Sequence, residues 1–124
     1  MNKVFPLSKE RLASCSHDRT VKIWKDDNTY ECISTLENID EVNSILQLRG
    51  KEILVSAYKK AKSLSLCGIS FWNIGDYTHQ HTIKGYGIHW PTHMIELFNG
   101  NIALSSSYPF LIVIIDSSSY EVKK

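Results

Sequence analysis

An internal repeat dominates the sequence and limits the folds open to it. Three short serine-containing segments come into register when the chain is laid against itself: Leu12-Ala13-Ser14, Leu54-Val55-Ser56 and Ala103-Leu104-Ser105. Each is followed by a second apolar segment that ends in a large apolar residue, at Trp24, Trp72 and Ile115. These ends are 48 and 43 residues apart, a period typical of a repeating four-stranded unit. We therefore expect three copies of one small sheet.

The pattern inside each unit is that of β-strands. Apolar residues alternate with polar ones or form short apolar runs, and no stretch shows helical spacing. Tyr30, Tyr77 and Tyr120 lie 6, 5 and 5 residues after the three unit ends and introduce a fourth strand. We predict an all-β chain whose units span about residues 1–37, 40–84 and 91–124. The middle unit is longer because residues 58–67 intervene between its second and third strands.

The first unit contains the most specific motif. Residues 14–25 read Ser-Cys-Ser-His-Asp-Arg-Thr-Val-Lys-Ile-Trp-Lys, which resembles the core signature of a WD repeat. The resemblance implies that Asp18 forms the tight turn and that Trp24 closes the third strand. The second unit, which ends in Ser70-Phe71-Trp72-Asn73, matches less closely, and the third matches mainly by register. The fold implied is three four-stranded antiparallel blades of an incomplete WD-repeat β-propeller.

The chain departs from the family pattern at several positions. Glu37-Asn38 and Gly85-Tyr86 stand where the family has a Gly-His pair, so the buried His-Ser-Asp-Trp network that the resemblance implies is incomplete. Leu66 and Pro109 stand where a turn aspartate is expected. We expect packing to hold each blade together instead. The residues assigned to the structural repeat signature are Ser14, Asp18, Trp24, Ser56, Trp72 and Ser105.

Three blades do not close a propeller, which typically has roughly 4 to 8. The two open flanks would expose apolar rows such as residues 112–115, which soluble proteins seldom leave uncovered. Three explanations stay open. The chain is a fragment of a longer propeller, or it self-associates into a closed ring such as a dimer, or it completes the ring of another protein.

The connections of an antiparallel meander alternate between two faces of the ring. The turns between second and third strands therefore share a face with the loops between blades, and we predict that a protein or peptide partner binds there. Exposed aromatic side chains would anchor the partner, although Trp90, next to Pro91, would serve equally well to plug the seam between blades. The predicted contact residues are Arg19, Asp40, Glu41, Lys59, Lys60, Lys62, Tyr86, His89 and Trp90.

The predicted function is a non-catalytic scaffold or adaptor segment for protein–protein interaction. One alternative is that Lys59, Lys60 and Lys62 bind nucleic acid or another polyanion. The 14 Lys and Arg against 13 Asp and Glu leave a formal net charge of only +1, which disfavours nucleic acid. Another alternative is a propeller fragment without a function of its own. Membrane insertion is not expected, because the longest apolar run, residues 110–115, is far shorter than the roughly 20 residues of a spanning helix.

No residue pattern points to catalysis, a cofactor or a metal. Ser16, His17 and Asp18 are adjacent on one turn, whereas a catalytic triad needs these groups to converge from separate positions. The histidines at positions 79, 81, 89 and 93 lack the further ligands of an obvious zinc site. Three cysteines without a CxxC pair, and the lack of a secretory signal, predict an intracellular location, in the cytoplasm with the nucleus left open.

Overall fold

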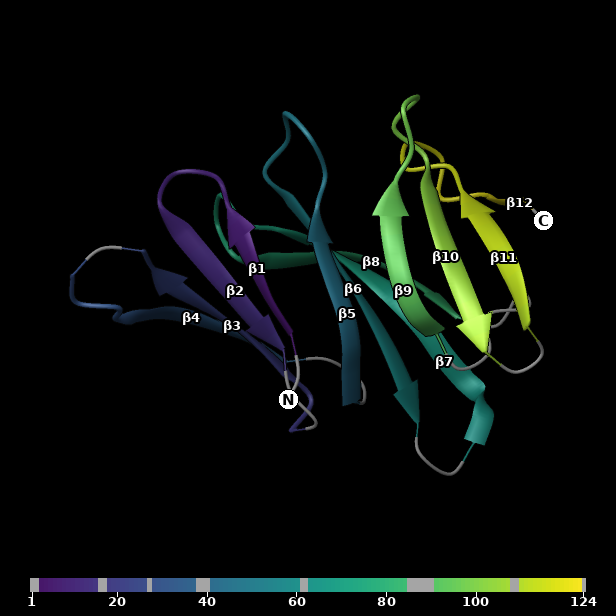
Figure 1. Ribbon diagram of the computed structural model, residues 1–124, viewed down its shortest axis with the longest axis horizontal. Coiled ribbons are helices and arrows are strands. Elements are labelled where there is room, and N and C mark those ends of the chain that lie inside the picture. Colours follow the sequence, from purple (N-terminus) through teal and green to yellow (C-terminus); the bar gives the residue numbers. More distant parts are fainter. Residues whose placement is uncertain are drawn as a thin grey trace.

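The computed structural model describes residues 3–15, 18–26, 28–37, 41–60, 63–84, 91–107 and 110–123, and these residues form strands joined by turns (Figure 1). Nothing within these ranges forms a helix of the length and apolarity needed to cross a membrane. The strands are β1 (Lys3–Leu7), β2 (Arg11–Cys15), β3 (Thr20–Lys25), β4 (Cys32–Glu37), β5 (Glu41–Gln47), β6 (Ile53–Lys60), β7 (Ser63–Asn73), β8 (Thr78–Lys84), β9 (Pro91–Glu96), β10 (Ile102–Ser107), β11 (Phe110–Ile115) and β12 (Val122–Lys123).

The strands form three antiparallel sheets that follow the chain in order. Blade 1 consists of β1–β4, blade 2 of β5–β8 and blade 3 of β9–β12, and within each blade every strand pairs with the next in sequence. The first strands, called the inner strands here, bring the blades together, because β5 contacts both β1 and β9. Figure 1 shows the sheets fanned out side by side. The predicted all-β class of three four-stranded antiparallel blades is confirmed.

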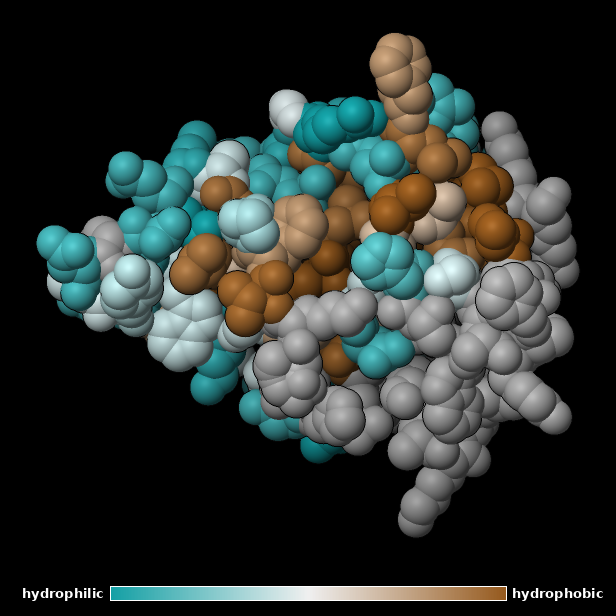
Figure 2. Space-filling model, viewed as in Figure 1, coloured by the Kyte–Doolittle hydropathy of each residue, from teal (hydrophilic) through white to brown (hydrophobic). Residues whose placement is uncertain are grey.

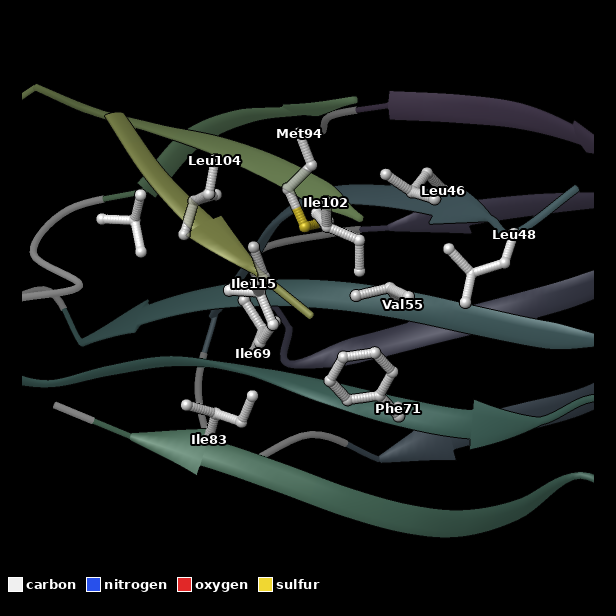
Figure 3. Close-up of a cluster of buried hydrophobic side chains, with 12 residues drawn as sticks. Leu46, Leu48, Val55, Ile69, Phe71, Ile83, Met94, Ile102, Leu104 and Ile115 are labelled. Atoms are coloured by element: carbon white, nitrogen blue, oxygen red, sulfur yellow. The ribbon is translucent and has the colours of Figure 1, made fainter. Parts of the chain in front are cut away.

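Burial alternates along the strands, so each blade presents a separate set of side chains to each neighbour. In β2, Arg11, Ala13 and Cys15 are buried while the residues between them are half-buried. Blade 2 is covered on both sides. Its side toward blade 1 buries Leu54 and Trp72. The cluster between blades 2 and 3, drawn in Figure 3, includes Leu46, Leu48, Val55, Ile69, Phe71, Ile83, Met94, Ile102, Leu104 and Ile115.

The turn from third to fourth strand has a similar backbone in all three blades. Tyr30, Tyr77 and Tyr120 have φ of 48°, 61° and 63°, in the left-handed region that side chains other than glycine seldom adopt. In blade 3 the Asp116 Oδ1 atom accepts a hydrogen bond from the Ser118 N–H at 2.8 Å, which stabilises the turn locally. Each tyrosine thus stands in the turn just before the fourth strand of its blade.

Two blades contain a Trp–Ser hydrogen bond between the second and third strands. Trp24 Nε1 donates to Ser14 Oγ at 3.0 Å, and Trp72 Nε1 donates to Ser56 Oγ at 3.0 Å. The expectation that packing alone replaces the family's polar network is therefore wrong for blades 1 and 2. The tryptophan and serine keep their bond although the preceding Gly-His pair is missing.

The assignment of Ser105 to the repeat signature is wrong by one residue. Cross-strand pairing defines the equivalent positions of the blades, and the pairs are Leu12 with Trp24, Leu54 with Trp72, and Ile102 with Ile115. Two residues further along the second strand, Leu104 occupies the position that Ser14 and Ser56 occupy. Since alternate residues face opposite sides of a sheet, Ser105 lies on the side away from blade 2.

Residues 58–60 and 63–67 belong to strands β6 and β7 and lengthen the hairpin that these two strands form. Lys60 at the end of β6 pairs with Ser63 at the start of β7. The two strands have 8 and 11 residues, against 5 and 6 for β2 and β3. Lys59 and Lys60 therefore belong to a strand of this longer hairpin.

Only alternate residues of the predicted apolar row at 112–115 lie on the free flank of blade 3. Ile112 is 58% exposed and Ile114 is half-buried. Val113 and Ile115 are fully buried in the cluster shared with blade 2. The free flank is thus apolar but narrower than the sequence suggests.

Ser56→Ala is expected to lower the free energy of unfolding by about 1–3 kcal/mol, because it removes the acceptor of the buried Trp72 N–H. Ser14→Ala is the matched control, and it should cost less because Trp24 is only half-buried and water can satisfy its N–H. Urea denaturation of the two variants measures the difference. Equal losses in both would contradict this account of the blade 2 bond.

Candidate protein-interaction site

The end of the blades where second strands turn into third strands, called the loop face here, is where the sequence predicts the contact residues. Asp40, Lys62, Tyr86, His89 and Trp90 lie outside the described residues, as do Ser16 and His17. Arg19 is described in full, and the remaining three, Glu41, Lys59 and Lys60, are described by their backbone. The opposite end of the blades, which carries the turns β1–β2, β3–β4, β5–β6, β7–β8, β9–β10 and β11–β12, is called the turn face.

Arg19 is exposed in the β2–β3 turn, with φ of 73°. The neighbouring Asp18 holds this turn, because its Oδ1 atom accepts hydrogen bonds from the Thr20 N–H at 3.1 Å and from Thr20 Oγ1 at 2.7 Å. These are the local bonds expected of a turn-forming aspartate. The backbone is therefore fixed at Arg19 while the side chain remains accessible.

An acidic residue lies beside the hairpin β6–β7, which carries Lys59 and Lys60. Glu41, the first residue of β5, is the register partner of Lys59 in β6. Directly opposed residues of an antiparallel pair lie close enough for their side chains to interact. The fold therefore places these two predicted contact residues opposite each other at the loop-face end of blade 2.

A buried arginine joins blades 1 and 2 at the turn face. Arg11 is 7% exposed, and its Nη1 atom donates to the Ile74 carbonyl at 2.8 Å and to Tyr77 Oη at 3.1 Å. Its Nη2 atom lies 3.4 Å from Glu52 Oε1, which also contacts Lys9 Nζ at 2.8 Å. A guanidinium is tolerated at such burial only with partners of this kind. These contacts therefore fix the position of blade 2 against blade 1.

The environment of Glu52 favours its ionised form. A hydrogen bond from the Lys9 ammonium is the main reason that the pKa of the Glu52 carboxyl lies below its ordinary value. Burial acts in the opposite direction, and the charges of Lys9 and Arg11 lower the pKa further. The carboxylate is thus held as an anion between two cations of the preceding blade.

Polar side chains also join the inner strands of neighbouring blades. Gln47 Oε1 accepts from the Ser8 N–H at 2.9 Å, and Gln47 Nε2 donates to Ser8 Oγ at 2.9 Å. Between blades 2 and 3, Glu96 Oε1 accepts from the Arg49 N–H at 2.7 Å and lies 3.3 Å from Arg49 Nε. The polar groups of the turn face thus hold the blades in a fixed relation.

Two of the histidines take part in aromatic packing. The His81 ring stacks on Tyr120 with centroids 4.1 Å apart, and the His79 ring meets Trp72 edge-on at 5.0 Å. Among the residues that the structure describes, no three His, Cys, Asp or Glu side chains are grouped so that they could hold a metal ion.

An apolar groove of about 450 Å³ runs along the inner strands. Figure 2, viewed as Figure 1, shows apolar side chains gathered over the region of β5 and β9. Gln47, Arg49 and Glu96 form a polar part of the lining, and a volume of this size is typical of ligand pockets. The apolar lining residues are Val4, Phe5, Ile45, Leu46, Met94 and Ile95.

Sequence reasoning missed the residues that join the blades, namely Arg11, Gln47, Glu52 and Glu96. A signal existed for Gln47 and Glu96, because each is the polar residue of an otherwise apolar segment and the two segments align. Arg11 and Glu52 gave no comparable signal, since each directly follows the residues of a turn, at 8–10 and 49–51, and does not stand out from them.

Comparison with known proteins supports the fold. No protein-family model matches the sequence, and no curated protein matches it significantly. A structure of U3-55K and a crystal structure of the RRP9 WD40 repeats each align with a TM-score of 0.77 and 15% identity, over 96% of this chain and 34% of theirs. A crystal structure of the WD40 β-propeller domain of Doa1 aligns with a TM-score of 0.74 and 18% identity, over 95% of this chain and 37% of that one. The fold is that of WD40 propeller blades, and the chain spans about a third of the length of the structures it matches.

Arg11→Met is expected to lower the free energy of unfolding by about 2–3 kcal/mol, because it removes charge-assisted hydrogen bonds between two blades while keeping most of the apolar contact. Arg49→Met serves as the control. The Arg49 side chain is 62% exposed, so its loss should cost no more than about 1 kcal/mol. Chemical denaturation of both variants decides the matter, and a smaller effect at Arg11 than at Arg49 would refute the assigned role.

Glu52 is expected to make stability depend on pH in acid. Its folded-state pKa lies below the unfolded value, so its stabilising effect is fully present above the unfolded pKa and is lost as the pH falls through the folded pKa. Glu52→Gln should therefore flatten the loss of stability in acid and leave the slope above neutrality unchanged. The check is a urea midpoint series between about pH 3 and 7. Identical slopes for both proteins would show that Glu52 does not contribute.

Proposed function

We propose that the chain is a non-catalytic scaffold segment that presents its loop face to a protein or peptide partner. The proposal is supported first by the blade-to-blade bonds of Arg11, Gln47 and Glu96, which hold three sheets in a fixed relation. A surface on such a frame loses little conformational freedom on binding, which favours affinity. The WD40 fold alone does not identify a partner.

The loop face is the proposed contact surface because the turn-face polar groups are engaged between blades. Arg19 is exposed on a turn whose backbone is fixed by Asp18. Arginine and aromatic residues are frequent among the residues that contribute most to protein interfaces. The proposed contact residues are Arg19, Asp40, Glu41, Lys59, Lys60, Lys62, Tyr86, His89 and Trp90.

A second candidate function is polyanion binding by the hairpin β6–β7. It is favoured by the extra length of this hairpin, which carries Lys59 and Lys60 beyond the span of β2 and β3. The register partner Glu41 opposes it. We therefore place this function behind protein binding.

The test compares capture of proteins from an extract of the source cells by the wild type and by variants. Arg19→Glu combined with Tyr86→Ala should reduce the amount of the specific partner by about tenfold or more, because such residues often contribute over 1.4 kcal/mol each. Lys51→Glu, on an exposed position of the turn face, is the matched control and should capture the same partner as the wild type. Equal capture by all three proteins would contradict the loop-face assignment.

The polyanion function has its own test in the retention of the protein on heparin. If the hairpin binds polyanions, retention should fall steeply with salt, and Lys59→Glu, Lys60→Glu and Lys62→Glu together should abolish it. Retention that the triple variant leaves unchanged would remove this candidate.

A further inference from the structure

One hydrogen bond recurs between successive blades at the same structural position. The backbone N–H just beyond the inner strand of one blade donates to a side-chain Oε1 of the next blade, from Ser8 to Gln47 at 2.9 Å and from Arg49 to Glu96 at 2.7 Å. We call it the seam bond. An N–H past the end of a strand has no partner in its own sheet, so the next blade provides the acceptor.

Strand pairing shows that the acceptors are equivalent. Gln47 is the register partner of Leu54, and Glu96 is the register partner of Ile102. In blade 1 the same position, opposite Leu12, is occupied by Pro6. The donors Ser8 and Arg49, and Phe98 in blade 3, each lie two residues after this position.

The tyrosine of the third-to-fourth-strand turn makes a second recurring contact, again with the preceding blade. Tyr77 accepts from Arg11 of blade 1. Tyr120 packs edge-on against Phe71 of blade 2, with ring centroids 4.8 Å apart. Each seam therefore has a direction. The preceding blade contributes an N–H and an apolar side, and the following blade contributes a Gln or Glu and a tyrosine.

The free flank of blade 3 carries the groups that a preceding blade contributes to the contact with the next blade. Phe98, at the donor position, is 99% exposed, and its N–H makes no hydrogen bond to any residue that the structure describes. Ile95 and Ile112 on the same flank are 50% and 58% exposed. They are the counterparts of residues that blade 2 buries against blade 3.

The free flank of blade 1 carries only one of the two groups that a following blade contributes. It carries Tyr30, which is 57% exposed. At the acceptor position it carries Pro6, which has no side-chain oxygen. The two free flanks of this chain therefore do not complete the seam bond with each other.

We propose that the free flank of blade 3 binds a further propeller blade whose inner strand ends in Gln or Glu followed by Leu, as found here at Gln47-Leu48 and Glu96-Leu97. This blade also carries a tyrosine in the turn before its fourth strand. A second copy of the chain is not the fitting partner, because Pro6 cannot accept the Phe98 N–H. The inference rests on the contacts between blades and is independent of the proposed loop-face function.

Giving blade 1 the missing acceptor tests the proposal. Pro6→Gln should let blade 1 of one chain bind blade 3 of another and strengthen self-association by about 5- to 150-fold, for two seam bonds of ordinary net strength in a closed pair. Pro6→Ala is the control, because it removes the proline without adding an acceptor, and it should behave like the wild type. Sedimentation velocity over a concentration series measures the association. A tight wild-type pair, or equal behaviour of Pro6→Gln and Pro6→Ala, would overturn the proposal.

Amide hydrogen exchange provides a second measurement that does not depend on self-association. In the wild type the Ser8 and Arg49 amides should be protected and the Phe98 amide should exchange freely. Gln47→Ala should remove protection at Ser8 alone, and Glu96→Ala should remove it at Arg49 alone. Fast exchange at Ser8 and Arg49 in the wild type would show that the seam bond does not form and would overturn the proposal.

Discussion

Contact between neighbouring sheets provides the burial that a single four-stranded sheet cannot provide for itself. Blade 2 illustrates this, because Trp72 on one side and Phe71 on the other are both buried, each against a different blade. Full burial of such side chains contributes roughly 1.5–3 kcal/mol each. The polar contacts between blades at the turn face depend on this packing.

The apolar contacts hold the blades together, but they do not determine how one blade is oriented on the next. Polar groups at the seams do this, since a hydrogen bond forms only at a defined distance and angle. Arg11 reaches both the Ile74 carbonyl and Tyr77, and Glu96 contacts both the backbone and the side chain of Arg49. Because the donors and acceptors lie on different sides of the seam, each blade has a preceding and a following flank that are chemically distinct.

The strand content was predictable because residue alternation and the repeat period both follow directly from sheet geometry. Ser105 was assigned to the wrong position because blade 3 has Ile115 where the other two blades have a tryptophan, and only the pairing of Ile102 with Ile115 defines the register. The long hairpin was missed because the lysines interrupt the apolar pattern of its strands.

The candidate site was less predictable than the fold. Asp18 could be assigned to a turn because its partner, Thr20, is two residues away. Arg11 could not be paired with Ile74, which lies 63 residues further along the chain, because that contact exists only once two blades have packed. The loop-face residues other than Arg19 remain predictions, since their side chains lie outside the described part of the chain.

The two Trp–Ser pairs show that the tryptophan N–H is satisfied within its own blade, whether or not a neighbouring blade covers the ring. Trp72 and Trp24 make the same bond at the same distance, yet Trp72 is 6% exposed and Trp24 is half-buried. The difference follows from blade 1, which covers Trp72, while Trp24 lies on the free flank. Since the serine already satisfies the indole N–H, covering the ring would leave no polar group unpaired. The internal bond thus makes the tryptophan suitable for burial by a neighbouring blade, independently of whether that blade is present.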